Sequence, residues 1–208
     1  MDKIICLGRN YPEHAKEMGG NPIERPVLFL KPPSVRRQIG KNGDRISVAL
    51  PRRDSSVHPE CEIIVWITQG GQNLTVEEAG ARIGWVTLGL DVTLRDIQAT
   101  AKKAGHPWTV SKVFRDSAIV GPWFAVSEFP NYKETEFRLL QGEKARQIGD
   151  PGQMMFSPAE AIAYASENFP LNPGDILFTG TPAGVGPVVA GDVVRLVWGK
   201  MNYEVAWT

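Results

Sequence analysis

Short runs of Val, Ile, Leu, Phe and Trp, punctuated by glycines and prolines, recur along the chain of 208 residues. Runs of this length and composition, separated by turn-forming residues, are typical of β-strands. Regular helical crossovers do not separate them, which argues against a doubly wound parallel sheet. We therefore predict an α+β fold that is mainly β, with a few short helices. The expected strands are Lys3–Leu7, Val27–Leu30, Glu60–Thr68, Gly84–Leu90, Phe137–Gln141, Asp175–Thr179, Asp192–Trp198 and Tyr203–Trp207.

Helix signals are fewer but specific. Ser157-Pro158-Ala159-Glu160 is a capping box with proline at the first helical position, and Thr75-Val76-Glu77-Glu78 is a second capping box. Glycines supply the expected helix ends. The predicted helices are Ser157 to about Asn168, one that starts at Thr75, Thr93 to about Ala104 before Gly105, and Pro12–Met18 before Gly19-Gly20.

Length and charge limit the classes of protein that fit. The chain is long enough for one substantial core, and the loop-rich stretch Lys31–Ser56 suggests a division into an N-terminal arm, 1–50, and a β-rich core, 51–208. Lysine plus arginine and aspartate plus glutamate both total 23, so no net charge attracts a nucleic acid. The start shows no signal peptide and no apolar run reaches membrane-spanning length, which predicts a cytoplasmic protein without a membrane partner. Cys6 and Cys61, both flanked by apolar residues, are expected to be buried free thiols.

Two acids interrupt the apolar character of "VHPECEIIVWI", Val57–Ile67. Side chains alternate along a strand, so Glu60 and Glu62 share one face, with Cα atoms about 6.6 Å apart. Carboxylates buried together at neutral pH require a proton, a basic side chain or a cation to compensate them.

A third acid, Asp91, is expected to close the strand just before the helix predicted at Thr93. Three acids at strand ends, without a Cys or His cluster, are oxygen ligands that suit Mg²⁺ or Mn²⁺ better than zinc. The alternative is that all three are strand-edge carboxylates that face water, because an E-x-E pair is a weak motif by itself.

Five segments resemble one known enzyme family. They are "GRNYPEHAKEM" (8–18), "HPECE" (58–62), "LGLDVTLRDIQ" (88–98), "PWTVSKVF" (107–114) and "PGDILFTGTPAGVGPV" (173–188). In this order they resemble the fumarylacetoacetate hydrolase superfamily, most closely its acylpyruvase and oxaloacetate decarboxylase branch. The resemblance implies a mixed β-sandwich or roll of the fumarylacetoacetase C-terminal-domain type. It also implies that Glu60, Glu62 and Asp91 bind one Mg²⁺ or Mn²⁺.

The same resemblance implies a reaction and the residues for it. A small 2-oxo acid would chelate the metal, and cleavage beyond C3 would give the pyruvate enolate, by hydrolysis of a 3-acylpyruvate or by decarboxylation of oxaloacetate. Lys112 would stabilise the negative charge, and His14 with Glu17 would activate water on a lid helix flanked by glycines. The substrate-binding candidates are Arg9, Tyr11, Gln98 and Thr181.

Several alternatives remain open at this level. Without the motif, Lys112 is an ordinary surface lysine, and a His-x-x-Glu pair is usually an exposed helical pair. The sequence departs from relatives at "RDSAIVGP" (115–122) and at Gln141-Gly142-Glu143, which puts the substrate in doubt. An isomerase or decarboxylase of the same superfamily, a structural metal-binding β module and a metal-dependent nuclease are the competing interpretations, the last disfavoured by the neutral charge. The resemblance also suggests a homodimer.

Overall fold

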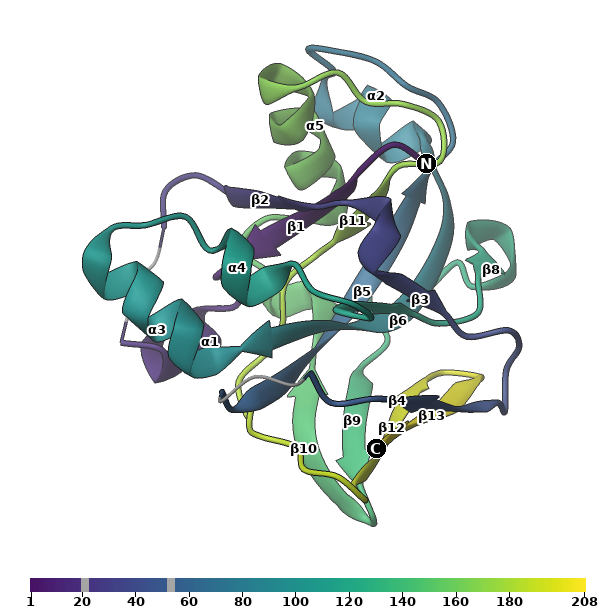
Figure 1. Cartoon of the computed structure of the whole chain (residues 1–208). Helices are drawn as coiled ribbons and strands as arrows, with labels where there is room; N and C mark the ends of the chain where they lie inside the picture. The colour runs from purple at the N-terminus through teal and green to yellow at the C-terminus, as the bar shows by residue number, and fades with distance from the viewer. Residues whose placement is uncertain (20–22, 52–54) are drawn as a thin grey trace.

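The computed structural model describes residues 1–19, 23–51 and 55–208, which form two β-sheets with short helices at their edges (Figure 1). The larger sheet is mixed. Its strand order is β2 (Val27–Lys31), β1 (Ile4–Gly8), β11 (Ile176–Phe178), β5 (Val57–Ile67), β6 (Ile83–Leu94), β7 (Ala118–Val120) and β3 (Arg36–Gln38), and β8 (Phe124–Ala125) also pairs with β6. The β1–β11 and β3–β7 pairs are parallel, and the other pairs are antiparallel.

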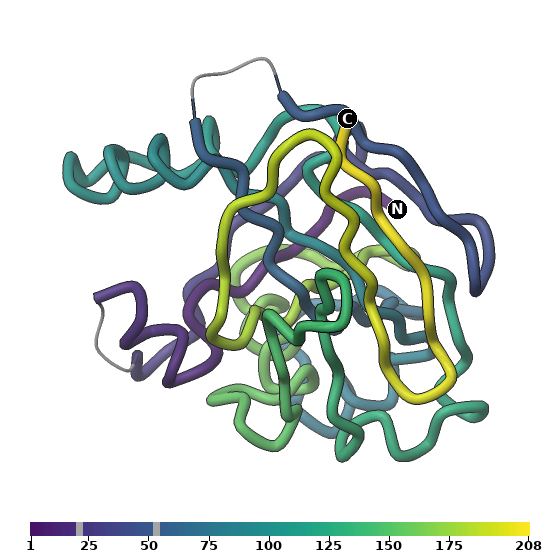
Figure 2. Tube along the Cα trace, turned by 90° about the horizontal axis from the view of Figure 1, so that it is seen from below, coloured from purple at the N-terminus to yellow at the C-terminus, as the bar shows by residue number. Residues whose placement is uncertain are grey.

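The smaller sheet has the order β10 (Lys144–Gly149), β9 (Phe137–Gln141), β12 (Val193–Trp198), β13 (Met201–Trp207) and β4 (Arg45–Val48). Only the β13–β4 pair in it is parallel. Seen from below, the β12–β13 hairpin lies in front of the rest of the chain (Figure 2). The fold is therefore mainly β and built from two sheets, as the sequence predicts.

The helices are short. Three of the five that the structure describes begin at the predicted signals, and the one over Thr109–Lys112 was not predicted. The helices are α1 (Pro12–Glu17), α2 (Val76–Ala81), α3 (Arg95–Ala104), α4 (Thr109–Lys112) and α5 (Pro158–Asn168), with 3₁₀ turns η1 (Pro33–Val35), η2 (Val126–Glu128) and η3 (Pro151–Gln153). Both capping boxes are present, at Thr75 with Glu78 and at Ser157 with Glu160. Gly105 ends α3 with a φ of 68°, in the left-handed region that glycine tolerates best.

Alternation along β5 divides its side chains between two cores. Cys61, Ile63, Val65 and Ile67 lie in the main core, which the second sheet covers, and Ile64 lies in a smaller apolar cluster on the opposite face. The hydroxyl of Tyr203 in β13 donates a 2.6 Å hydrogen bond to the Leu88 carbonyl in β6 and so joins the sheets. Cys6 and Cys61 are both buried free thiols, as expected.

Two expectations near Asp91 were wrong. Strand β6 continues past Asp91 to Leu94, and α3 begins at Arg95 instead of Thr93. The extension has a clear cause, because β5 pairs with β6 without interruption from Val57↔Leu94 to Trp66↔Trp85. Asp91 is therefore an interior residue of a central strand.

The stretch Lys31–Ser56, which the sequence predicts to be loop-rich, contains two strands. Within it, β3 joins the larger sheet and β4 joins the smaller one. The division into an arm, 1–50, and a core, 51–208, stays a prediction. Gly20, one of the two glycines expected to end the first helix, lies outside the described residues.

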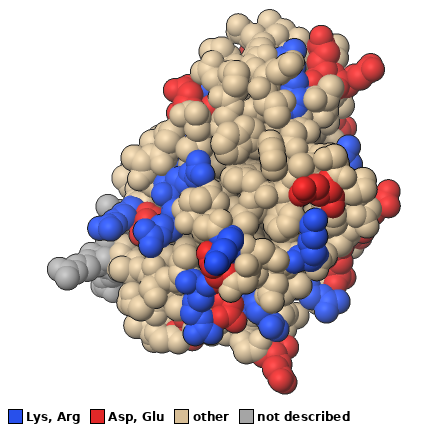
Figure 3. Space-filling model, turned by 90° about the vertical axis from the view of Figure 1, so that its right-hand side faces the viewer, with Lys and Arg blue, Asp and Glu red and all other residues tan. Residues whose placement is uncertain are grey.

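Two surface properties bear on the expected partners. Among the described residues, no helix combines the length and apolar character that crossing a bilayer requires. On the face drawn in Figure 3, basic and acidic side chains are interspersed, in keeping with equal totals of 23. The absence of nucleic-acid and membrane partners stays a prediction.

The close contact of β6 with its neighbours gives a stability prediction. A Cβ atom at Gly89 would lie 2.2 Å from the Ile119 carbonyl oxygen and 2.3 Å from Ile64 Cδ1. We expect Gly89→Ala to lower the free energy of unfolding by about 1–3 kcal/mol, because β7 must shift to make room. In helix α2, a Cβ at Gly80 would meet only Ala159 Cβ, at 3.5 Å. Gly80→Ala should therefore be neutral or stabilising by up to about 1 kcal/mol. Urea unfolding of both variants tests this, and equal stability of the two would contradict it.

Candidate active site

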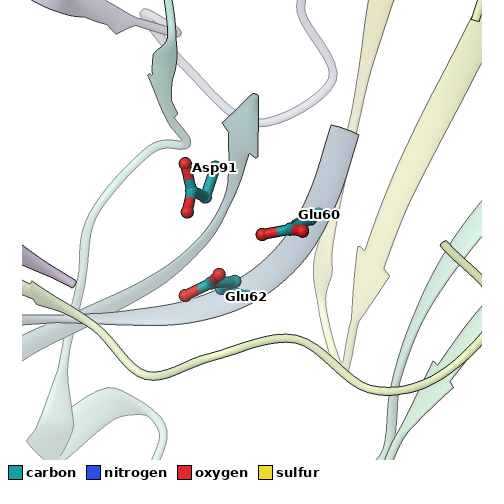
Figure 4. Close-up of side chains that lie close together, drawn as sticks. All are labelled: Glu60, Glu62 and Asp91. Carbon is teal, nitrogen blue, oxygen red and sulfur yellow. The ribbon is translucent and has the colours of Figure 1, made fainter. Parts of the chain in front are cut away.

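The register of two central strands brings the three predicted acids together. Glu60 in β5 is paired with Asp91 in β6, and Glu62 is paired with Gly89 one step along the same face. Residues directly opposite each other in an antiparallel pair project to the same side of the sheet. Figure 4 shows the three carboxylates turned toward a common space. One oxygen from each lies within 4.8 Å of those of the other two, and all three residues are buried.

Basic side chains from three further elements surround these carboxylates. Lys112, the last residue of α4, places Nζ 2.8 Å from Glu60 Oε2 and 2.6 Å from Asp91 Oδ2. Arg95, the first residue of α3, forms an ion pair with Glu60. Lys31 at the end of β2 lies 2.5 Å from Asp91 Oδ1. Three cations thus form ion pairs with two of the three acids, Glu60 and Asp91.

Burial and the neighbouring charges have opposite effects on the pKa values of Glu60 and Lys112, and the neighbouring charges dominate. Burial alone would raise the pKa of Glu60, but Lys112 and then Arg95 hold it well below its ordinary value. Burial alone would lower the pKa of Lys112, but Asp91 and Glu60 outweigh this and raise it. Both groups are therefore charged at neutral pH. Such a cluster costs desolvation energy, which close pairing offsets.

Glu62 differs from the other two acids because it lacks a basic partner. Glu62 is 1% exposed, and its Oε2 accepts a 2.7 Å hydrogen bond from the Gly180 backbone N–H. Among the described residues, no lysine, arginine or histidine nitrogen forms an ion pair with it. Burial, followed by Asp91 and Glu60, raises the pKa of Glu62 well above its usual value. A bound cation would compensate the negative charge of the buried Glu62 carboxylate.

The donor set fits a divalent cation such as Mg²⁺ or Mn²⁺. Carboxylate oxygens are the ligands that hard divalent ions prefer. Oxygens bound to one Mg²⁺ at about 2.1 Å lie no more than about 4.2 Å apart, so carboxylates whose oxygens lie within 4.8 Å of one another need to close by only a few tenths of an ångström to bind one ion. Asp91 Oδ1 is buried 2.5 Å from Lys31 Nζ, which also donates to the Ser117 and Val92 carbonyls, so a metal ion bound there would share this oxygen with Lys31.

A pocket opens beside the acids. The space in it that water can reach is about 20 Å³, enough for one or two water molecules, and the Lys112 and Arg95 side chains reach across the carboxylates. The residues that line the pocket come from strands, helices and loops: Leu7, Gly8, Arg9, His14, Met18, Phe29, Glu60, Glu62, Arg95, Gln98, Lys102, Trp108, Lys112 and Thr181.

His14 and Glu17 are in contact on α1, as their spacing predicts. His14 Nδ1 lies 3.1 Å from Glu17 Oε2, and His14 lines the pocket. Glu17 does not line the pocket, but its two oxygens accept hydrogen bonds from the Gly184 N–H at 3.2 and 3.3 Å. This contact links α1 to the loop after β11 and orients the imidazole.

The four substrate-binding candidates occupy different environments. Arg9 lines the pocket, and so does Gln98, which accepts a 2.7 Å hydrogen bond from Arg95. Thr181 also lines it, but its hydroxyl donates to the Cys61 carbonyl and accepts from Gln147 Nε2, at 2.8 and 2.7 Å. Tyr11 is 2% exposed within the main core and is not a lining residue. Their roles toward a substrate stay predictions.

Sequence reasoning missed several residues of this site. Arg95 had a usable signal, because it lies in the "LGLDVTLRDIQ" segment one helical turn before Gln98. Lys31 gave none, since only tertiary packing brings the end of β2 to Asp91. Lys102 and Trp108 were likewise missed, although both line the pocket.

Comparisons with known proteins find relatives over most of the chain. Residues 3–203 match the family described as fumarylacetoacetate (FAA) hydrolase C-terminal. An oxaloacetate tautomerase of Escherichia coli is 37% identical, with 95% of this chain and 89% of that protein covered. The human mitochondrial oxaloacetate tautomerase is 36% identical, with 92% and 85% covered.

A solved structure extends the likeness to three dimensions. Fumarylpyruvate hydrolase from Pseudomonas aeruginosa, in complex with Mn²⁺ and pyruvate, superposes with a TM-score of 0.92 at 32% identity, covering 100% of this chain and 91% of that one. The match of sequence over nearly the whole chain, together with the shared fold, shows that the protein belongs to the fumarylacetoacetate hydrolase family.

Proposed function

We propose that this protein is a divalent-metal-dependent hydrolase that cleaves a C–C bond in small 2-oxo acids of the 3-acylpyruvate type. The observation that carries the proposal is the convergence of three buried acids beside a pocket that Glu60, Glu62 and His14 line. Glu60, Glu62 and Asp91 would hold Mg²⁺ or Mn²⁺. The likeness to a hydrolase structure that contains Mn²⁺ and pyruvate supports both the metal and the substrate class.

The metal ion and the residues around it would have separate roles in the proposed reaction. When bound, the ion supplies Lewis acidity toward the 2-oxo acid. Lys112 holds a buried positive charge beside the acids, where it stabilises negative charge that develops on the substrate. The three acids and the cations Lys31, Arg95 and Lys112 are equal in number, so a divalent ion and an anionic substrate can enter together without leaving a large buried charge.

Hydrolysis also needs an activated water. Because His14 Nδ1 faces Glu17, that nitrogen carries the proton in the productive tautomer and Nε2 is left to accept a proton from water. The proton thus moves from water to His14 while the oxygen adds to the distal carbonyl of the acylpyruvate. Collapse of that adduct breaks the C–C bond and releases a carboxylic acid and the enolate of pyruvate, which takes up the proton from His14. Glu17, anchored at Gly184, keeps the ring oriented and stabilises the imidazolium that forms.

Tautomerisation or decarboxylation of oxaloacetate is a second candidate function, and one specific observation favours it. Relatives that are 36–37% identical over more than nine-tenths of this chain are named oxaloacetate tautomerases. Tautomerisation and decarboxylation of oxaloacetate use the same 2-oxo acid end but do not require an attacking water. A purely structural metal site would not need the pocket-facing His14. The cytoplasmic location and the homodimer stay predictions.

The metal assignment is tested by Glu62→Gln, which removes one charge and preserves the shape of the side chain. We expect the affinity for Mn²⁺ to fall more than about a hundredfold, since even residues behind the ligands contribute factors of 10–100. Pyruvate release from an acylpyruvate should fall with it and should stop in the parent protein when a chelator is added. Calorimetry gives the affinity, and Glu77→Gln, an exposed acid on α2, is the control. Unchanged Mn²⁺ binding in Glu62→Gln would show that the site is misassigned.

The role of α1 is tested by His14→Ala. We expect acetylpyruvate hydrolysis to fall roughly a hundredfold or more, the usual cost of losing a general base, while oxaloacetate decarboxylation is largely spared. His106→Ala, which alters an exposed histidine after α3, should leave both rates unchanged. Equal loss of both activities in His14→Ala would instead assign His14 to folding or to closure of the pocket. Full retention of hydrolysis would remove it from the mechanism.

A further inference from the structure

Where it carries the glutamates of the site, strand β5 is paired with a strand on one side only, in the part of the chain that the structure describes. β11 pairs with residues 64–66 and ends before the glutamates, while β6 continues past them. On the open side, side chains bind the backbone of Cys61, which lies between the two glutamates. Its N–H donates to Gln147 Oε1 at 2.9 Å, and its carbonyl accepts from the Thr181 hydroxyl at 2.8 Å. Two side chains from elsewhere in the chain thus replace a neighbouring strand at the candidate metal site.

The Gln147 side chain closes a ring of hydrogen bonds along this open side. Its Nε2 donates to the Thr181 hydroxyl at 2.7 Å and to the Pro182 carbonyl at 2.8 Å. Gln147 is 1% exposed, and the orientation of its amide is fixed, because the Cys61 N–H can only donate and the Pro182 carbonyl can only accept. One buried amide therefore ties β5 to the loop after β11 (180–187).

The loop after β11 contributes to three parts of the proposed site. Its Gly180 N–H donates to the carboxylate of Glu62, the acid that forms no ion pair among the described residues. Its Thr181 lines the pocket. Its Gly184 N–H donates to Glu17, which orients the catalytic imidazole. A shift of this loop would disturb the acids, the pocket wall and the histidine–glutamate pair together.

A β-bulge in the smaller sheet directs Gln147 toward the loop. The β9–β10 register shifts between Ala145 and Gln147, which leaves Arg146 as an extra residue. Bulges bend a strand, re-aim its side chains and are frequent next to active sites. Arg146 Nη1 donates to the Pro187 carbonyl at 3.0 Å, whereas Gln147 binds Pro182 near the start of the loop. Strand β10 therefore holds the loop near both of its ends.

We propose that Gln147 is a positioning residue for the metal site. It holds the Glu62 carboxylate from two directions, through Cys61 in the same strand and through Thr181, which follows the Gly180 donor. Without Gln147, strand and loop can move apart, and Glu62 loses its place beside the other two acids. The inference rests on the proposed function, because it assumes that the three acids bind one divalent ion.

Titration calorimetry with Mn²⁺, in the absence of substrate, tests this role. Gln147→Met keeps the length of the side chain and removes the three hydrogen bonds of the amide. We expect its affinity for Mn²⁺ to fall about tenfold or more, the usual effect of losing a residue that orients a ligand from behind. The electron paramagnetic resonance spectrum of the bound Mn²⁺ should change as well, because a displaced Glu62 oxygen alters the ligand geometry.

Thr181→Val is a second variant, which carries the test if Gln147→Met does not fold. It keeps the shape of the side chain and removes only the hydroxyl that links Gln147 to the Cys61 carbonyl. The affinity for Mn²⁺ should fall in the same direction, by a smaller factor than in Gln147→Met.

Ser166→Ala is the matched control. Ser166 is also buried, and its hydroxyl bonds the Leu74 N–H and the Ala163 carbonyl at α5, away from the acids. It should lower stability in urea and keep the Mn²⁺ affinity within about twofold of the parent value. Parent-like Mn²⁺ affinity and spectrum in every folded variant would overturn the positioning role and leave the proposed function standing. So would an equal loss of affinity in Ser166→Ala. A parent protein that binds no Mn²⁺ would overturn both.

Discussion

The buried charge cluster between β5, β6 and α4 is the interaction on which the rest of the structure depends. Glu60 and Asp91 are tolerated inside the protein because Lys112 contacts both, and Arg95 and Lys31 complete their neutralisation. Removing one partner of such a cluster leaves an uncompensated charge, whereas exchanging one cation for another does not. The protein therefore combines stable packing with a place where a divalent ion can take over part of the compensation.

The register of β5 and β6 fixes the positions of the acids in this cluster. A shift of one residue in the β5–β6 register would move the acids to the face that packs against the second sheet. Two contacts oppose such a shift. Gly89 admits Ile64 and the Ile119 carbonyl at distances that no larger residue allows, and the Tyr203 hydroxyl holds the Leu88 carbonyl. The site is thus placed by the rigid part of the fold, and α1 adds its histidine from the edge.

Features of the fold and the site that neighbouring residues determine could be predicted from the sequence, whereas features that tertiary packing determines could not. Capping boxes, the Gly105 helix end and the shared face of Glu60 and Glu62 follow from neighbouring residues, and the structure has all of them. The continuation of β6 to Leu94 does not, because it arises from pairing with β5. Lys31 likewise reaches Asp91 only through tertiary packing. The family motifs pointed to the three acids and to Lys112, but the ion pairs of Arg95 and Lys31 that complete their compensation were visible only in the fold.

Anomalous diffraction from crystals grown with Mn²⁺ and pyruvate tests the central claim most directly. The account predicts one manganese peak bounded by the carboxylates of Glu60, Glu62 and Asp91, within ligand distance of an oxygen from each. Pyruvate should lie on the side of the ion that faces the pocket. A protein saturated with Mn²⁺ that shows no peak there, with the Lys112 ammonium still bonded to both Glu60 and Asp91, would contradict it.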